Sequence, residues 1–201
     1  MRRLSLAALA TSVAVAAVAW PTAGHAHPHV WITAQARLGF ERGALATIAM
    51  RWGFDAMFSD YVRGEYDKNG DGSFDAAETG SIAAEAFANL KDFDFLTHLT
   101  AGSEELPLEV YRDFVAKLEG DTVVYEFVLP LPRPVDPKAS PVKLALYDDT
   151  FYLDISFSAE NPVSFGADAP GCGYDIKPDP GRSIYMGLVN PLAATLTCPV
   201  S

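Results

Sequence analysis

The sequence predicts an α+β fold: an antiparallel β-sandwich or barrel-like body into which an EF-hand helix–loop–helix is inserted. Two strand-like runs near the start, 30–40 and 45–52, are joined by a turn at 41–43 and predict an opening hairpin. Apolar side chains then recur at helical spacing on both sides of a polar, glycine-containing loop, at about 54–93. After this insertion the pattern returns to short strands separated by turns, which does not favour parallel βαβ units.

The individual elements follow from the residues at each position. The apolar face of the first helical run is formed by Phe54, Met57, Phe58, Tyr61 and Val62, and that of the second by Ile82, Ala83, Ala86, Phe87 and Leu90. The later strand-forming runs are 95–100, 109–118, 122–129, 142–147 and 151–157. The proline-rich stretch 130–141 predicts an extended loop, because proline has no backbone N–H to donate. The glycine- and proline-rich stretch 166–181 predicts an irregular closing segment.

The first residues have the features of a secretory signal peptide. Arg2 and Arg3 precede an uncharged apolar run, and small residues at 24 and 26 predict cleavage after Ala26. The alternative is a transmembrane anchor, but a run of ~17 residues is at the short limit for a span. We therefore expect residues 1–26 to be removed and 27–201 to form a single β-rich domain in the periplasm, with no stable membrane insertion.

The chain is acidic, with 26 Asp and Glu residues against 15 Lys and Arg residues and a formal net charge of −11. Such a surface disfavours nucleic acids and anionic lipids, and it favours cations or basic partners. The composition therefore argues against a nucleic-acid-binding protein. Solubility alone is the other explanation of the charge.

The two cysteines, Cys172 and Cys198, lie near the end of the chain. In an oxidising compartment such a pair favours a disulfide, and the wide spacing argues against a redox centre. Two thiolate ligands for a metal are the alternative, although no cluster of Cys and His surrounds either residue. We expect a disulfide that stabilises the domain by ~3–4 kcal/mol in the chain-entropy description.

Residues 67–78 fit the twelve-residue calcium loop of an EF-hand position by position. The expected calcium ligands are Asp67, Asn69, Asp71, Ser73, Asp75 and Glu78. Gly72 at the sixth position allows the sharp turn, and Phe74 at the eighth is an apolar plug. The alternative is an acidic turn without a metal. A single loop in an exported protein is typical of weak affinity, ~10⁻⁴–10⁻³ M, so calcium would be structural.

Cleavage after Ala26 would give the mature protein a free amine on His27, followed by Pro28 and His29. An amine and imidazole nitrogens suit nickel, cobalt, copper or zinc. Pro28 has no amide hydrogen to lose, which excludes square-planar binding through successive backbone amides. His98 is a candidate third ligand. The alternatives are polar residues at a chain end for His27 and His29, and a core or edge residue for His98.

No nucleophile–base set stands out, and the sequence contains no nucleophile-elbow Ser, P-loop or His-Glu-x-x-His motif. We therefore name no catalytic residue and do not expect an enzyme.

Several segments together resemble a family of bacterial periplasmic proteins of unknown function. They are His27-Pro28-His29-Val30-Trp31-Ile32, Arg51-Trp52-Gly53-Phe54-Asp55, the loop 67–78, Ala86-Phe87-Ala88-Asn89-Leu90 and Tyr147-Asp148-Asp149-Thr150-Phe151-Tyr152. Members of that family are commonly labelled as the periplasmic component of an ABC-type transport system, and often occur beside nickel/cobalt-exporter permeases. The resemblance implies a role in transition-metal handling next to a membrane transporter or permease.

Three hypotheses follow. The first is a periplasmic metal-binding accessory protein of nickel, cobalt or zinc transport, stabilised by calcium. The second is a calcium-stabilised extracytoplasmic interaction module without a transition metal. The third is a copper enzyme in which His27 forms a histidine brace with His29 or His98.

Overall fold

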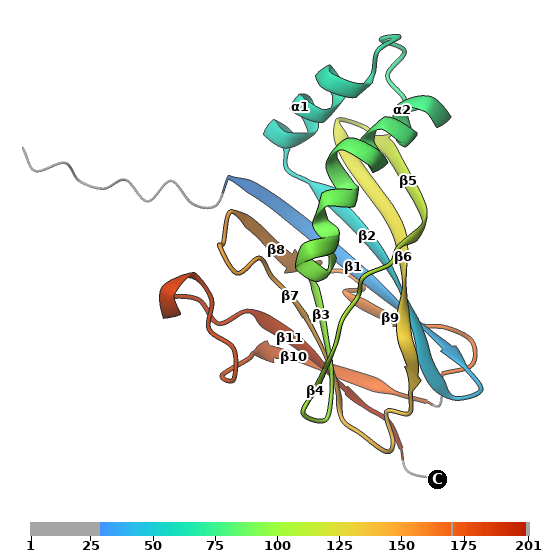
Figure 1. The fold of residues 1–201 in the computed structure, drawn as a ribbon, viewed down its shortest axis with the longest axis vertical. Helices are drawn as coiled ribbons and strands as arrows, with labels where there is room; N and C mark the ends of the chain where they lie inside the picture. Colours follow the sequence, from blue (N-terminus) through green and yellow to red (C-terminus); the bar gives the residue numbers. More distant parts are fainter. Residues whose placement is uncertain (1–28, 170, 200–201) are drawn as a thin grey trace, which may run out of the picture.

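The computed structural model describes residues 29–169 and 171–199. The predicted signal segment, the cleavage site after Ala26 and the candidate ligand His27 lie outside these residues. The described chain is a mixed α+β structure with two sheets of mostly antiparallel strands and a few helices, which confirms the predicted fold class at that level. Figure 1 shows the helices of residues 56–82 at one end of the long axis and the strands forming the body.

The elements are two strands, then a helical segment, and then the remaining strands. The first part contains β1 (Val30–Glu41), β2 (Ala44–Phe54), α1 (Ala56–Tyr66), α2 (Ala76–Ile82), the π-helical turn η1 (Ala83–Phe87) and the 3₁₀ segment η2 (Ala88–Leu96). The second part contains β3 (Thr97–Ala101), β4 (Glu104–Leu106), β5 (Arg112–Glu119), β6 (Thr122–Val135), β7 (Val142–Leu146), β8 (Leu153–Phe157), β9 (Val163–Phe165), β10 (Gly173–Pro178), η3 (Tyr185–Gly187) and β11 (Leu192–Thr197).

The first sheet is built around the predicted opening hairpin and has the order β5-β6-β2-β1-β8, with β9 also paired to β1. Side chains of β1 alternate strictly between buried and more exposed positions, as expected for a strand with one face on a core. Two of its pairings differ from the predicted antiparallel body, because β8 and β9 run parallel to β1. These pairings join residues far apart in the sequence, so the spacing of apolar residues along the chain could not predict them.

The proline-rich stretch is only partly the predicted loop. Strand β6 continues to Val135 and pairs with β2 through Pro130, with a register shift farther along. Prolines are tolerated where a strand does not need the N–H for its ladder. The predicted loop is therefore limited to the residues between Val135 and Val142.

The second sheet has the order β10-β11-β7-β3-β4. Its strand β10, which pairs with β11, corrects the prediction that residues 166–181 are irregular throughout. Most residues of β10 are exposed, and glycine and proline stand at its ends, so the usual signals of a buried strand are missing. Figure 1 shows these two strands on the side of the body away from β5 and β6.

The helical segment lies between β2 and β3 and runs from Ala56 to Leu96. Its second part is not one regular helix, since α2 ends at Ile82 and is followed by a π-helical and a 3₁₀ stretch. Phe87 of this part is buried against Trp52 of β2 and Phe127 of β6. Buried residues from both sheets and from the helices belong to one hydrophobic core.

Candidate functional site

The acidic loop is held between two capped helices. Asp55 caps α1, because its Oδ1 accepts the N–H of Phe58 at 3.0 Å, while its Oδ2 accepts the N–H of Trp31 at 2.9 Å. Asp75 caps α2, and with Glu78 it forms a reciprocal capping box. Helix α1 ends at Tyr66, where the N–H of Asp67 donates to the carbonyl of Arg63, and the Asp75 cap fixes where α2 begins. The segment 67–75 between them therefore has a defined path.

Within the loop, carboxylate and amide oxygens accept the backbone N–H groups. Asp67 accepts the N–H groups of Gly70 at 2.8 Å and Gly72 at 3.0 Å. Asn69 Oδ1 accepts the N–H of Asp71 at 2.8 Å, and Asp71 accepts the N–H of Ser73 at 2.9 Å. These bonds wrap the backbone around the oxygen-bearing side chains.

Two features adjust the loop locally. The hydrogen bond from the Ser73 hydroxyl, with that from the Ser73 N–H, lowers the pKa of Asp71 below its ordinary value. Gly70 and Gly72 have positive φ values of 70° and 79°, a conformation that favours glycine. The glycine at the sixth loop position therefore has the turning role predicted for it.

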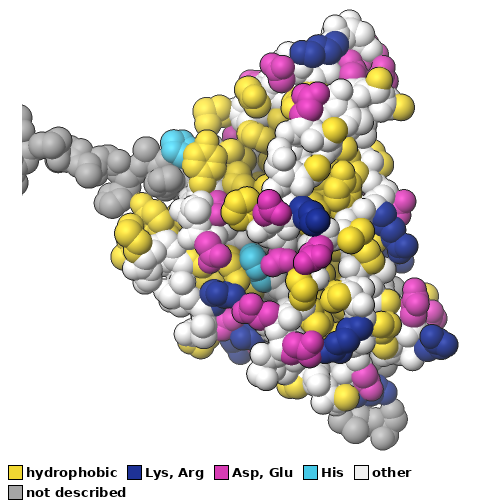
Figure 2. All heavy atoms as spheres, in the orientation of Figure 1, with side chains coloured by type: hydrophobic (Ala, Val, Ile, Leu, Met, Phe, Trp, Pro, Cys, Tyr) yellow, Lys and Arg dark blue, Asp and Glu magenta, His cyan; other side chains and the backbone are white. Residues whose placement is uncertain are grey.

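Glu78 joins the two ends of the loop. It is buried, and its Oε1 accepts the N–H of Lys68 at 2.8 Å while its Oε2 accepts the N–H of Asp75 at 3.0 Å. Burying a carboxylate is costly unless it is hydrogen-bonded, and these two backbone N–H groups supply the hydrogen bonds. Figures 1 and 2 together show acidic side chains at the end of the molecule where α1 and α2 lie.

The oxygen donors suit calcium in kind and in number, since five side chains and one backbone carbonyl come from the predicted positions. In the described residues, however, no group of three or more His, Cys, Asp or Glu side chains is gathered closely enough to hold a metal ion. The carboxylates are turned to backbone N–H groups instead. Calcium binding would require several of these oxygens to converge on one point.

The predicted histidine ligands lie in different surroundings. His29 precedes β1, where its N–H donates to the carbonyl of Tyr152 at 2.9 Å and the two ring centroids are 4.7 Å apart. His98 lies in β3 of the second sheet, and its ring stacks on Tyr147 with centroids 3.6 Å apart. Neither belongs to a group of three metal-ligating side chains within residues 29–169 and 171–199.

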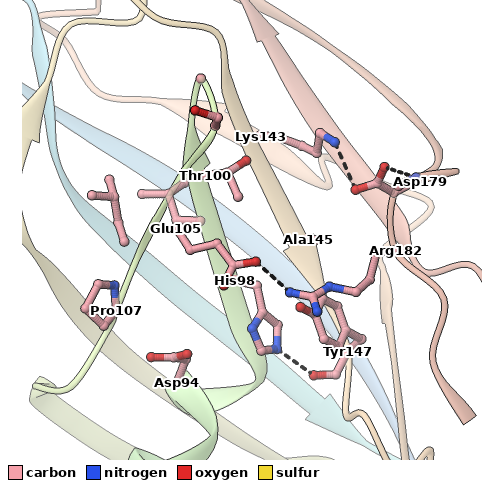
Figure 3. Close-up of a pocket in the computed structure, with 15 residues that line it drawn as sticks. Asp94, His98, Thr100, Glu105, Pro107, Lys143, Ala145, Tyr147, Asp179 and Arg182 are labelled. Carbon is pink, nitrogen blue, oxygen red and sulfur yellow. Dashed lines mark hydrogen bonds and ion pairs between the residues drawn. The ribbon is translucent and has the colours of Figure 1, made fainter.

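His98 lines a cleft of about 530 Å³ on the second sheet. Strands β3 and β7 form its floor, and the segment 179–182 forms one wall. Figure 3 shows the ring of His98 between Tyr147 and the side of the cleft where Asp94 and Pro107 lie. One ring nitrogen, Nε2, is 3.1 Å from the carbonyl oxygen of Tyr147.

The basic side chains in this cleft are already paired. Arg182 donates to Glu105 at 2.8 Å, and its guanidinium lies 5.2 Å from the centre of the Tyr147 ring. Lys143 donates to Asp179 at 2.9 Å. Figure 2 shows acidic and basic side chains interspersed around a histidine on this face. A ligand in the cleft would therefore meet two neutralised cations rather than a basic patch.

Asp94 was not predicted as a site residue. Its Oδ1 accepts the N–H of Leu108 at 2.9 Å, which fixes the side chain at the edge of the cleft. Asp94, Phe95 and Leu96 all have positive φ values, so the chain makes an unusual turn just before β3. No sequence pattern marks such a turn in residues other than glycine. The helical pattern of the preceding residues predicted only that the helical insertion ends near residue 93.

Burial shifts the pKa values of two side chains that line the cleft. It lowers the pKa of His98, with the hydrogen bond to the Tyr147 carbonyl and the charge of Asp94 acting in the opposite direction. It also raises the pKa of Tyr147 to about 12. His98 is therefore held mainly as a neutral imidazole near pH 7.

The cysteine pair predicted from the sequence lies at disulfide distance, with an S–S separation of 1.96 Å between Cys172 and Cys198. It ties the start of β10 to the residue after β11. No free cysteine remains in the described residues.

The fold and the sites together define a two-sheet α+β domain with an acidic helix–loop–helix at one end and a mixed-charge cleft on one sheet. The chain belongs to a family described as proteins of unknown function (DUF1007), whose sequence profile matches residues 12–194.

Two relatives are similar over most of their length. An uncharacterised 15.5 kDa protein in the trpE 3′ region of Spirochaeta aurantia is 34% identical over 134 residues, which is 66% of this chain and 95% of the relative. An uncharacterised protein of Haemophilus influenzae is 24% identical over 162 residues, covering 79% of this chain and 77% of the relative. Among the described residues, no helix combines the length and apolar character needed to cross a membrane.

Proposed function

We propose that the protein is a periplasmic metal-binding accessory protein of a transition-metal transporter, with a β-sandwich body stabilised by calcium. In this proposal residues 1–26 are a cleaved signal peptide, and α1, loop 67–78 and α2 act as an EF-hand. The transported metal would be nickel, cobalt or zinc, and the partner a membrane permease.

The observation that carries the calcium part is the closure of the loop by Glu78. Its carboxylate bridges the N–H groups of Lys68 and Asp75, so the last ligand of the motif already lies between the two ends of the loop. Asp67, the first ligand, lies at the centre of the amides that follow it. Calcium would bind both residues through carboxylate oxygens drawn together around one ion.

The transition-metal part is supported by the acidic charge of the chain, by the histidines and by the family resemblance. Imidazole nitrogen is a borderline ligand that prefers zinc, nickel, cobalt or copper to calcium. Calcium and transition metals would therefore use different atoms of the same protein. This separation makes the proposal testable.

The test is a titration of the mature protein, produced with its native N-terminus and stripped of metal, with nickel, cobalt, zinc and copper ions. We expect one transition-metal ion per chain, with an affinity unchanged when about 5 mM calcium fills the loop. Glu78→Gln should leave this binding intact. Absence of binding to all four ions at micromolar concentrations would reject the function.

A second candidate is the calcium-stabilised interaction module. It is favoured by large apolar side chains that remain exposed near the helical end, such as Trp31, Met57 and Tyr61. Exposed apolar groups of this kind mark surfaces that bind other proteins. A protein whose melting temperature rises with calcium, but which binds no transition metal in the titration above, would favour this candidate.

A further inference from the structure

The strongest feature outside the acidic loop is the ring of His98, which is fixed in place but uses only one of its two nitrogens in the bonds of the described structure. A carbonyl oxygen can only accept, so the contact with Tyr147 requires the proton of the ring to be on Nε2. The neutral ring then has a bare lone pair on Nδ1. Figure 3 shows this second nitrogen directed to the side of the cleft where Asp94 and Pro107 lie.

This arrangement is the one that proteins use to prepare a histidine as a metal ligand. A ligating histidine nearly always donates its other N–H to a backbone carbonyl or a carboxylate, which fixes the tautomer and the ring plane. Here the stacking on Tyr147, with an interplanar angle of 9°, holds the same ring from one face. The side chain is therefore preorganised to present Nδ1.

Asp94 supplies a second ligand on the same side of the cleft. Its Oδ1 is engaged by the N–H of Leu108, and Oδ2 is left for a ligand. Its carboxylate and the imidazole of His98 line the same cleft, and Figure 3 shows both on one side of it. An imidazole and a carboxylate together select divalent ions of the zinc, nickel and cobalt type.

We propose that this cleft, through His98 Nδ1 and Asp94, is the transition-metal site of the protein, and that the N-terminal His27 and His29 are not required. The inference rests on the proposed function and gives it a location. The cleft of about 530 Å³ leaves space for several waters or a small chelating molecule around the ion, since a water occupies ≈ 30 Å³. Two protein ligands make an exchangeable site, which suits transfer of an ion rather than permanent storage.

The charges around the cleft allow a cation to enter. Arg182 is held by Glu105, and Lys143 is held by Asp179, so neither ammonium nor guanidinium points unpaired at the proposed ion. With Asp94 included, the lining side chains carry one more negative than positive charge while His98 is neutral. This balance favours a divalent cation over an anion.

The test compares His98→Gln, Asp94→Asn, His29→Gln and a chain with one extra residue before His27 in titrations with zinc, nickel and cobalt ions. Gln at position 98 keeps an N–H for the Tyr147 carbonyl but removes Nδ1, and Asn at position 94 keeps an oxygen for Leu108. We expect the first two variants to bind at least about tenfold more weakly. The His29 variant and the extended chain should differ less than about twofold from the unchanged protein.

A second measurement does not depend on how well a variant folds. Cobalt added to the unchanged protein should broaden or shift the NMR signals of the His98 ring and leave those of the His29 ring in place. Loss of binding in the His29 variant or the extended chain, with His98→Gln unaffected, would overturn the inference while the proposed function stands. Binding unaltered in all four proteins would also overturn it. Absence of binding to the unchanged protein would reject the inference and the proposed function together.

Discussion

Replacing Glu78 by Gln should abolish the stabilisation of the protein by calcium. An ion that binds only the folded chain adds RT ln(1 + [L]/Kd) to the free energy of unfolding. With Kd of ~10⁻⁴–10⁻³ M, about 5 mM calcium contributes roughly 1–2.3 kcal/mol. For a domain of this size that corresponds to a rise in Tm of roughly 2–9 °C.

The same substitution has a second, metal-independent effect that the structure allows to be separated. Gln has one oxygen in place of two, so it can satisfy Lys68 N–H or Asp75 N–H, but not both. One buried amide would lose its acceptor, at a cost of about 1–3 kcal/mol. The Tm of Glu78→Gln should therefore be lower than that of the unchanged protein even in a calcium chelator.

The assay is thermal unfolding followed by circular dichroism, in chelator, in calcium and in magnesium. Glu85→Gln is the matched control, because Glu85 is exposed and lines the same pocket beside the loop as Glu78, but is not itself a loop residue. The control should keep the full calcium response. A calcium-dependent rise in Tm that is equal in both variants, or a rise with magnesium that matches the one with calcium, would refute the reasoning.

Four further outcomes can be checked by chemical or thermal unfolding. Ser59→Ala should cost about 1–3 kcal/mol, because the buried Ser59 hydroxyl accepts the N–H of Val123 at 3.0 Å; a cost below the error of the measurement would contradict this. Tyr125→Phe should be neutral or stabilising by about 1 kcal/mol, since this hydroxyl is buried without a hydrogen-bond partner among the described residues. Cys172→Ser with Cys198→Ser should lower the free energy of unfolding by about 3–4 kcal/mol, because the bond closes a loop with a sequence separation of 26; stability equal to that of the oxidised protein would argue against a stabilising role. Asp154→Asn should raise Tm at pH 7, because burial raises the pKa of Asp154 and so penalises its ionised form in the folded state. That advantage should shrink as the pH falls through the raised pKa of folded Asp154 and should be gone below the ordinary Asp pKa of ~3.9, where Asp154 is protonated in both states; an advantage that grows in acid would contradict the sign.

The parts of the fold that depend on residues close together in the sequence were predictable. The hairpin of β1 and β2 follows from alternating side chains and a turn at Arg42 and Gly43. The acidic loop follows from its spacing alone, because all its oxygen-bearing residues lie within twelve positions. Both involve contacts between residues close in the sequence, which is the information that periodicity carries.

The parts that depend on distant pairing were not predictable in this way. The cleft assembles Asp94 and His98 with Tyr147 and Arg182, and it forms only because β3 pairs with β7 and the segment after β10 folds beside them. The sequence marked His98 as a candidate but offered no partner for it. The turn made by Asp94 has a positive φ of 49°, for which a non-glycine residue gives no local signal.

The parallel pairing of β1 with β8 and β9 has a consequence for how the chain assembles. As the polypeptide emerges from its amino end, β1 can pair with β2 at once, but its other edge waits for residues 153–165. Until then, a long strand with a strongly apolar face keeps one row of backbone groups unpaired, and such an edge readily recruits strands of other molecules. Closing it requires contacts across more than a hundred residues, which slows folding. The period between synthesis of the first strand and arrival of its parallel partners is therefore when this protein most needs protection from aggregation.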